Sequence, residues 1–257
     1  MLRRSPVRVP AGAAAHRPGS AASARLDVLA AHPHDPSAFT QGLHWCDGLL
    51  YEGTGGFGSS ELRVVDVDTG LVRRRIGLAA EVFGEGVAAV GDQIWQLTWR
   101  EGIAFRRDRV TLAEHARVPY DREGWGLCHD ADSGRLIMSD GTCRLTFRDP
   151  TTFDAVGTVD VRRESAPTDS PFPMMLNDLS CSGGLVWANV YPTDEIVGID
   201  PETGEIAVTV DATALHAEQD LATAGVLNGI TSVPGTDRFL ITGKHWSRLY
   251  EVRLVAH

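Results

Sequence analysis

Short apolar runs recur along this chain, and each run follows the same three-residue motif, whose copies begin 40 to 52 residues apart. The motif consists of a variable residue, then glycine or aspartate, then an aliphatic residue. Its five copies begin at Gln41, Glu85, Trp125, Asn177 and Asn228. Each run has the length and composition of one β-strand, and the runs are residues 49–55, 94–99, 136–142, 185–191 and 239–244. A repeat of this length made only of short strands is typical of a β-propeller blade.

The rest of each repeat predicts two further strands. A third strand ends in a turn with Asp-Pro or Thr-Gly in several copies; proline presets φ and glycine accepts positive φ. A more polar fourth strand follows in the first four copies, at 71–78, 115–119, 155–161 and 206–212. The fifth copy continues only with residues 248–254, so we expect residues 25–30 to supply its outer strand. The sequence therefore predicts an all-β, five-bladed propeller that an N-terminal strand closes.

Composition fits one globular domain and disfavours several partners. The 257 residues are 43% hydrophobic and carry a formal net charge of −10. We expect residues 25–257 to form a single propeller domain, since this length can bury one sizeable core. The acidic balance disfavours nucleic acid as a partner. No segment approaches the roughly 18 apolar residues of a membrane span, so we expect no membrane partner, and we expect a monomer.

Three segments depart from the repeat pattern. Residues 1–24 are basic, rich in Ala, Pro and Ser, and lack the apolar region of a secretory signal. We expect them to be a disordered extension, or the product of a start codon placed too far upstream. Residues 164–175 form a proline-rich loop, and residues 212–225 suggest a short helix. Both segments directly precede a copy of the motif, so we expect them to form walls of a site at that face.

The chemistry of the variable positions marks this site. Equivalent positions of a propeller lie on a ring around its axis, so the first residues of the five motifs form one ring. The last residues of the five apolar runs form a second ring: Gly55, Trp99, Thr142, Tyr191 and Lys244. A structural ring would hold similar residues, whereas these two hold one carboxylate, one lysine, several amides and three aromatic residues. Such diversity at symmetric positions is typical of a site grafted onto a repeat scaffold.

Longer motifs around these positions resemble the plant-type glutaminyl cyclase family, which also occurs in bacteria. They cover roughly residues 32–253 in order: FTQGL at 39–43, FGEG at 83–86, QLTW at 96–99, EGWGL at 123–127, SDGT at 139–142, WANV at 187–190, VLNGI at 226–230 and TGKHW at 242–246. The resemblance implies a five-bladed propeller with glutaminyl-peptide cyclotransferase activity. Such an enzyme converts the N-terminal glutamine of a peptide or protein to pyroglutamate and releases ammonia. The resemblance also implies a site built from Phe39, Gln41, Phe83, Glu85, Trp99, Trp125, Asn177, Tyr191 and Lys244.

The sequence departs from the family pattern at three places. Tyr191 stands where the family usually has tryptophan, so one aromatic wall is smaller and carries a hydroxyl group. Asp178 follows Asn177 where glutamate is usual, and Gly53 replaces a serine in the hairpin of the first copy. None of these changes removes the carboxylate at position 85.

The residue set fits an intramolecular cyclisation. The substrate's α-amine attacks its own γ-amide carbon, and one carboxylate can take the amine proton and return it to the leaving nitrogen. Glu85, between Gly84 and Gly86, is the candidate. Five aromatic residues would wall the site and raise the pKa of Glu85: Phe39, Phe83, Trp99, Trp125 and Tyr191. Gln41, Asn177 and Lys244 would bind the developing oxyanion, with Lys244 contributing most through its charge.

Competing interpretations rest on other residues. Glu52 and Glu123 are alternative acids near the same face, but neither occupies a ring position. Trp45, Trp95 and Trp187 fall inside strands, and we expect them in the core. A non-catalytic propeller that binds a protein partner remains an alternative, as does a calcium-dependent, lactonase-like propeller hydrolase. The latter would need several Asp, Asn and Glu ligands on the axis.

We expect no metal site and no cofactor. His32-Pro33-His34-Asp35 contains ligand-type side chains, but its prolines make a stiff turn. The four cysteines show no C-x-x-C spacing, so a structural zinc is not expected. Cys46 and Cys181 fall in non-adjacent blades, and Cys128 and Cys143 in separated strands of one blade, so we expect four free thiols. Free thiols argue against an oxidising compartment, whereas the family resemblance implies secretion or the periplasm; the sequence leaves the compartment open.

Overall fold

The computed structural model describes residues 21–163, 174–220 and 222–256, and these residues are almost entirely β-strands and turns. Three separate four-stranded sheets have their strands in sequence order, and all their neighbouring strands are antiparallel. The first consists of β2 (Thr40–Cys46), β3 (Leu49–Thr54), β4 (Glu61–Val65) and β5 (Val72–Gly77). The second consists of β6 (Gly84–Val90), β7 (Gln93–Thr98), β8 (Ile103–Asp108) and β9 (Glu114–Pro119). The third consists of β10 (Leu127–Asp130), β11 (Arg135–Ser139), β12 (Arg144–Arg148) and β13 (Ala155–Asp160).

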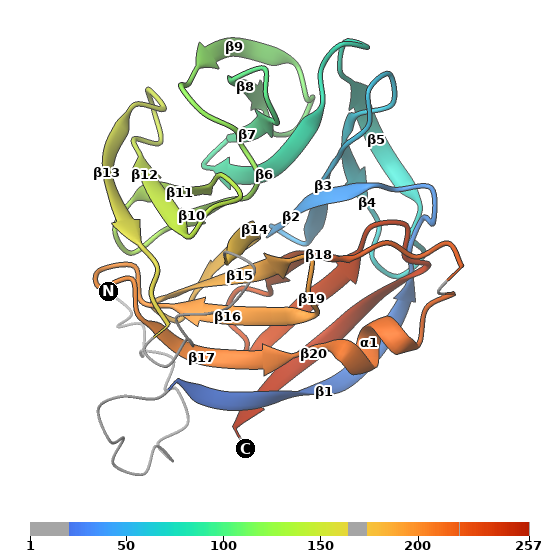
Figure 1. The fold of residues 1–257 in the computed structure, drawn as a ribbon. Helices are drawn as coiled ribbons and strands as arrows, with labels where there is room; N and C mark the ends of the chain where they lie inside the picture. Colours follow the sequence, from blue (N-terminus) through green and yellow to red (C-terminus); the bar gives the residue numbers. More distant parts are fainter. Residues whose placement is uncertain (1–20, 164–173, 221, 257) are drawn as a thin grey trace, which may run out of the picture.

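The remaining strands form one eight-stranded sheet in the order β14-β15-β16-β17-β1-β20-β19-β18. Its first half is β14 (Met175–Ser182), β15 (Leu185–Tyr191), β16 (Glu195–Ile199) and β17 (Ile206–Asp211). Its second half is β1 (Ala22–Pro33), β20 (Arg248–Ala256), β19 (Arg238–Gly243) and β18 (Leu227–Ser232). Figure 1 shows the sheets around a common centre, with β2, β6, β10, β14 and β18 nearest the middle. The molecule is therefore an all-β, propeller-like structure.

The N-terminal strand joins the two ends of the described chain. β1 pairs antiparallel with β20, from Ala24 opposite Ala256 to Pro33 opposite Arg248. Its first residues also pair in parallel with β17. The prediction that residues 25–30 pair with the C-terminal strand is confirmed, and the strand is longer than predicted. It begins at Ala22, inside the segment 1–24 that was expected to be an extension; residues 1–20 lie outside the described residues.

The two predicted insertions have different outcomes. A short helix, α1 (Thr213–Ala217), is confirmed within residues 212–225. Most of the loop 164–175 lies outside the described residues. Within the described chain, no helix has the length and apolar character needed to cross a bilayer.

The first three motif glycines lie where the innermost strands of successive sheets touch. A Cβ atom built on Gly42 would lie 2.7 Å from Gly86 Cα, and one built on Gly86 would lie 2.7 Å from Trp125 O. A Cβ on Gly126 would overlap the Asn177 carbonyl oxygen. Real Cβ atoms do not approach other atoms this closely, so these positions need glycine. The motif thus recurs because it lets neighbouring sheets meet around the centre.

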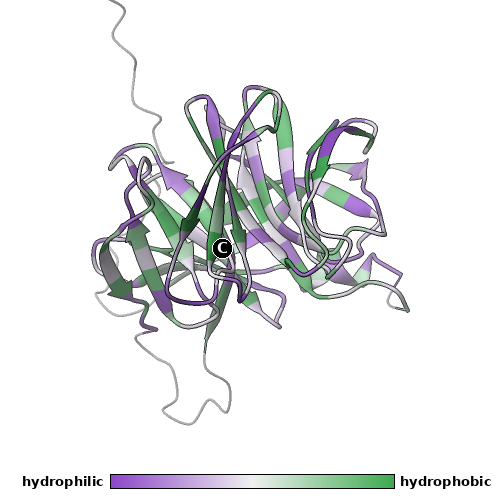
Figure 2. Ribbon diagram, turned by 90° about the horizontal axis from the view of Figure 1, so that it is seen from above, coloured by the Kyte–Doolittle hydropathy of each residue, from purple (hydrophilic) through white to green (hydrophobic). Residues whose placement is uncertain are grey.

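Buried hydrophobic residues form core clusters between the sheets, and Figure 2 shows hydrophobic residues along many of the strands. Trp95 is fully buried and Trp187 is nearly so, as predicted, whereas Trp45 is only partly buried beside a core cluster. Trp246 is fully buried as well and was not singled out from the sequence. It packs with Tyr250 and with the short helix, and its indole N–H donates to Gly225 O at 2.9 Å.

The prediction of four free thiols is wrong. Cys128 in β10 and Cys181 in β14 form a disulfide, with their Cα atoms 5.7 Å apart, while Cys46 and Cys143 are free. The two bonded cysteines lie on innermost strands of sheets that touch each other. Comparing cysteines at equivalent repeat positions, or within one sheet, could not detect this neighbouring pair. Because two of the cysteines form a disulfide, the cysteines no longer argue against an oxidising compartment.

Removing this disulfide is expected to lower the free energy of unfolding by about 2–4 kcal/mol, because it closes a loop of 53 residues in the unfolded chain. Denaturant unfolding of Cys128→Ala/Cys181→Ala, compared with wild type, would measure the loss. Cys143→Ala is the matched control, since Cys143 is free and exposed. A double variant as stable as the control would show that the cross-link has no stabilising role.

The segment with ligand-type side chains near the N-terminus is occupied by internal contacts. The His34 Nε2 atom lies 3.1 Å from Glu52 Oε1, and Asp35 accepts a hydrogen bond from Arg63 at 3.0 Å. Arg63 also donates to Glu52 at 2.9 Å. These contacts attach the end of β1 to β3 and β4. Within the described residues, no group of three or more His, Cys, Asp or Glu side chains is arranged to hold a metal ion.

Candidate active site

The first residue of the motif lies at a β-bulge in four of its five copies. The pairing register shifts between Thr40 and Gly42, Gly84 and Val87, Leu176 and Leu179, and Leu227 and Ile230. A bulge leaves a residue out of the ladder and turns its side chain in a new direction. The variable residues Gln41, Glu85, Asn177 and Asn228 are thus released from regular pairing near the centre of the molecule.

Three of these residues form a chain of hydrogen bonds that ends on Glu85. Asn228 Nδ2 donates to Thr40 O at 3.0 Å and to Gln41 Oε1 at 3.3 Å. Gln41 Nε2 in turn donates to Glu85 Oε1 at 2.6 Å. All three side chains are buried. The network fixes the orientation of the Glu85 carboxyl group, and it leaves Glu85 Oε2 buried with no hydrogen-bond partner among the described residues.

Glu85 and Lys244 are both buried, and burial shifts the pKa of each. Burial raises the pKa of Glu85 well above its ordinary value, and the Lys244 charge and the Gln41 hydrogen bond oppose that rise. Burial also lowers the pKa of Lys244 to about 8, against the attraction of Glu85. Two titratable groups with perturbed pKa values in one site are typical of acid–base chemistry. The structure places the predicted carboxylate and the predicted lysine close enough to influence each other.

The five predicted aromatic residues form two groups of contacting rings, and Lys244 lies between the groups. Lys244 Nζ lies 4.5 Å from the ring centre of Phe39 and 5.5 Å from that of Tyr191. The Phe39 ring contacts Phe83, and Tyr191 contacts Trp125 at 5.6 Å between centroids. Phe83 continues to Trp99 at 5.5 Å. These side chains, called the aromatic rim below, are half-buried, whereas Glu85 and Lys244 are buried, so the rim is more exposed than the polar group it contacts through Lys244.

Glu123 closes this rim. Its Oε2 atom accepts the indole N–H of Trp99 at 2.8 Å and that of Trp125 at 3.1 Å. Burial acts to raise the pKa of Glu123, but the hydrogen bonds from Trp125, Arg100 and Trp99 outweigh it and lower the pKa. A carboxylate held ionised by two indoles and a guanidinium is a poor proton carrier. Glu123 therefore positions the two tryptophans, a role that its place next to a ring residue did not reveal.

The fold and this site can be compared with known proteins. A family model described as glutamine cyclotransferase matches residues 6–254. The chain belongs to the glutamine cyclotransferase family. The glutaminyl-peptide cyclotransferase of Arabidopsis thaliana is 34% identical over 236 residues, which cover 89% of this chain and 71% of the plant protein. The crystal structure of Myxococcus xanthus glutaminyl cyclase matches with a TM-score of 0.82 and 34% identity, over 93% of this chain and 100% of that one.

This cyclotransferase has a second buried carboxyl group at its centre, Asp178, which was not predicted from the sequence as a site residue. Asp178 Oδ2 accepts backbone N–H groups from Leu43 at 3.1 Å and Ile230 at 2.9 Å. Its own N–H donates to Asn228 Oδ1 at 3.3 Å. Burial raises the pKa of Asp178 to about 8, against the hydrogen bonds from Ile230 and Leu43. The sequence did contain a sign that Asp178 is unusual, because the other four copies of the motif have glycine at this position.

Glu52, the other competing acid, serves the fold. It accepts hydrogen bonds from Thr40 Oγ1 at 2.8 Å and from Arg63 Nε at 2.9 Å, and it contacts His34. Burial acts to raise the pKa of Glu52, but His34, Arg63 and Thr40 together lower it to about 2. Glu52 is thus held as an ion in the contacts that attach β1.

The remaining ring positions differ in role. Asn177 is buried, and its Oδ1 atom has no hydrogen-bond partner among the described residues. Gly55 makes room for the aromatic rim, because a Cβ atom there would overlap the Phe83 ring. Thr142 is exposed, and its hydroxyl donates to Asp140 in a turn. The second ring therefore contributes three of its five residues to the site: Trp99, Tyr191 and Lys244.

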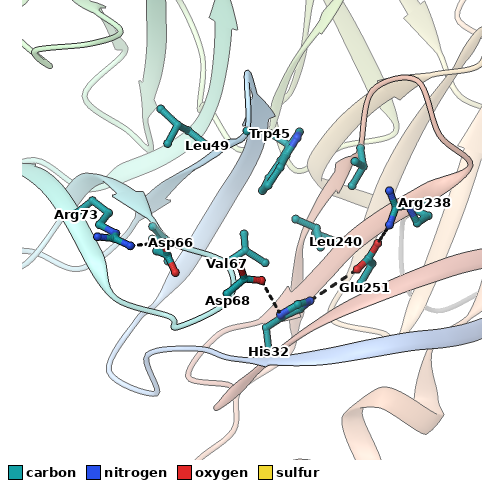
Figure 3. A pocket seen from close by; sticks show the side chains of 13 residues that line it. His32, Trp45, Leu49, Asp66, Val67, Asp68, Arg73, Arg238, Leu240 and Glu251 are labelled. Atoms are coloured by element: carbon teal, nitrogen blue, oxygen red, sulfur yellow. Dashed lines mark hydrogen bonds and ion pairs between the residues drawn. The ribbon is translucent and has the colours of Figure 1, made fainter.

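Two cavities lie away from these residues. One, of about 530 Å³, is lined by His32, Trp45 and several charged side chains (Figure 3). Its charges pair with one another, since Arg73 contacts Asp66 and Arg238 contacts Glu251. The other, of about 740 Å³, is lined by the first turns after the innermost strands and by the disulfide. Neither contains a residue of the polar group or the aromatic rim.

Proposed function

We propose that this cyclotransferase acts on the N-terminal glutamine of peptides and proteins, with Glu85 as its general acid–base and Lys244 as its electrostatic catalyst. The observation that carries the proposal is a buried carboxyl group, Glu85, that shares the centre of the molecule with a buried lysine, Lys244, whose ammonium group lies 4.5 Å from the Phe39 ring and 5.5 Å from the Tyr191 ring. The curated relative and the solved structure named above carry cyclotransferase and cyclase names. The buried, partnerless Oε2 atom of Glu85 supports a role in contacting a ligand.

The reaction needs a proton to move twice. The neutral α-amine attacks the γ-carboxamide carbon of the same glutamine, which forms the five-membered ring and places negative charge on the carbonyl oxygen. Glu85 takes a proton from the attacking nitrogen and returns it to the departing nitrogen, which leaves as ammonia. Its raised pKa suits both directions of transfer near neutral pH.

Positioning and charge account for the rest of the acceleration. The amine and the amide belong to one residue, so holding that residue in a folded conformation removes much of the entropic barrier. Lys244 and the amides of Gln41 and Asn177 would stabilise the oxyanion, with Lys244 contributing most. The aromatic rim would exclude water and hold the aliphatic part of the glutamine side chain.

We also propose that the fold is a five-bladed propeller, with the eight-stranded sheet counted as two blades that share the β1–β17 contact. Contacts between motif copies support this count. Gln41 contacts Glu85, and Gly86 N donates to Trp125 O. Gly126 N donates to Ser139 Oγ, which in turn donates to Asn177 O. Asp178 N donates to Asn228, and Asn228 donates back to Thr40 O. Each copy thus contacts the next, and the fifth contacts the first.

Ammonia release from a peptide with N-terminal glutamine tests the function directly. We expect time-dependent release together with a pyroglutamyl product that is 17 Da lighter, both with and without a chelator. Loss of activity in chelator that zinc or calcium restores would contradict the metal-independent mechanism. Absence of product from all glutaminyl peptides would instead favour a binding propeller, and release of a hydroxy acid from a lactone would favour a propeller hydrolase.

Restoring the usual tryptophan at position 191 tests the aromatic rim. Tyr191 contacts Trp125 and lies near Lys244, so it belongs to the rim, and we assign it no role in proton transfer. We expect Tyr191→Trp to change KM by a few-fold, about 1 kcal/mol or less, because most of the aromatic contact survives. Steady-state kinetics would measure the change. A several-hundredfold change in kcat at constant KM would place Tyr191 in the chemistry.

A further inference from the structure

One aromatic side chain continues the rim outwards into solvent. Phe57 is 59% exposed, and it is the one aromatic residue among the large exposed hydrophobic side chains of the described chain. Its ring centre lies 5.3 Å from that of Phe83, with the planes at 71°. Phe83 in turn contacts Phe39 and Trp99. An unbroken series of rings therefore runs from the neighbours of Lys244 to the surface.

The loop that carries Phe57 is held in place without help from its side chain. Ser59 N and Ser60 N both donate to Gly56 O, at 3.0 and 2.8 Å. Ser60 Oγ accepts the Gly84 N–H at 2.9 Å, which attaches the loop to the strand that carries Glu85. Gly56 and Gly58, on either side of Phe57, have φ values of +123° and +78°, which favour glycine. The backbone thus presents Phe57 at a fixed place, and folding does not require its ring to be buried.

We propose that Phe57 determines specificity by binding the side chain of the residue that follows the N-terminal glutamine. The inference rests on the proposed function, which places the glutamine itself against Glu85 and Lys244. The rest of the peptide must then leave the polar group across the aromatic rim. Consecutive Cα atoms are about 3.8 Å apart, and the ring centres follow one another at 5.9 Å from Phe39 to Phe83 and 5.3 Å from Phe83 to Phe57. The second side chain is therefore within reach of the outer part of the rim, where Phe57 and Phe83 meet.

The chemistry of this outer rim favours an apolar second residue. Phe57 and Phe83 offer ring faces and edges, which pack best on aromatic or aliphatic groups. Arg100, a charged residue on the Trp99 ring, stacks there at 3.8 Å and donates to Glu123 at 3.0 Å. Its charge is therefore already paired. We expect peptides with phenylalanine or leucine in second place to be better substrates than those with glycine or glutamate.

Three substrates separate this role from a general effect on catalysis: glutaminyl-phenylalanine amide, glutaminyl-glycine amide and glutamine amide, which has no second residue. For Phe57→Ala we expect the ratio of kcat/KM between the first two to fall by roughly 3–10-fold, the usual effect of one aromatic contact. Glutamine amide should change by less than about twofold, which also reports correct folding. Phe57→Leu should keep most of the selectivity. Val156→Ala is the matched control, since Val156 is 58% exposed on the outer strand β13.

The results of this experiment distinguish a failure of the Phe57 proposal from a failure of the proposed function. An unchanged ratio in Phe57→Ala, or an equal loss for all three substrates, would overturn the role of Phe57 and leave the proposed function standing. A wild-type protein that cyclises all three substrates without preference would also overturn the role of Phe57 and leave the proposed function standing. A wild-type protein that cyclises none of them would overturn the proposed function, and the specificity role with it.

Discussion

Replacing Glu85 with glutamine is expected to lower kcat by roughly 10²–10⁴-fold, the usual contribution of general acid–base catalysis. The change keeps the shape of the side chain, and its carbonyl oxygen can still accept the hydrogen bond from Gln41. It removes the group that we propose to take and return the proton. Stability should stay equal or rise slightly, because an ionisable group in a buried site is costly. Ammonia release and thermal unfolding, measured on the same preparation, would test both parts.

Glu123→Gln is the matched control for this experiment. It removes a carboxylate from the same site but keeps an oxygen that can accept from the indoles of Trp99 and Trp125. We expect a loss of less than about tenfold, seen mainly in KM, because its role is to position the rim. Glu52→Gln should act on stability, since Glu52 is enclosed by His34, Arg63 and Thr40. A Glu85→Gln variant with more than a third of wild-type turnover, or a dead Glu123→Gln variant, would contradict the assignment.

The repeat made much of the fold predictable from the sequence. Five copies of one motif gave the strand pattern, and the unequal fifth copy indicated that an N-terminal strand was needed beside β20. This short motif is informative because its glycines are required by the close packing of neighbouring sheets. Gly42, Gly86 and Gly126 lie where adjacent sheets touch, and no side chain fits there. The same symmetry indicated the candidate site, since chemically different residues at equivalent positions are not needed for the repeat to fold.

What the sequence could not predict are contacts between copies. Asp178 bonds to backbone groups of two other motif copies, and Glu123 bonds to one tryptophan beside it and one 24 residues earlier. The disulfide likewise joins two different sheets. Alignment of the copies shows which residues are equivalent, but not which side chain reaches across to a neighbour. Such contacts between side chains of different copies depend on the positions of the bulges and on the distances between strands, which are known only from the folded structure.

The loss of the Lys244 charge is expected to lower kcat by about 10²–10³-fold in Lys244→Met, the effect of removing one oxyanion partner. The pH dependence makes this prediction specific to charge. Lys244 is protonated below its pKa of about 8 and loses its charge as the pH rises through that value. Wild-type kcat should therefore fall above about pH 8. On the acid side it should fall as Glu85 becomes protonated, at a pH well above the ordinary carboxyl range.

Two substitutions at position 244 should separate charge from shape. Lys244→Met should lose the alkaline fall, and its acid fall should move to higher pH, because the ammonium that opposes the rise in the Glu85 pKa is gone. Lys244→Arg should retain more activity and keep it beyond pH 8, since a guanidinium stays protonated there. An alkaline fall that persists unchanged in Lys244→Met would assign that limb to another group. Lys244 would then bind the glutamine, but its charge would have no effect on kcat. The oxyanion would be stabilised only by the side-chain amides of Gln41 and Asn177.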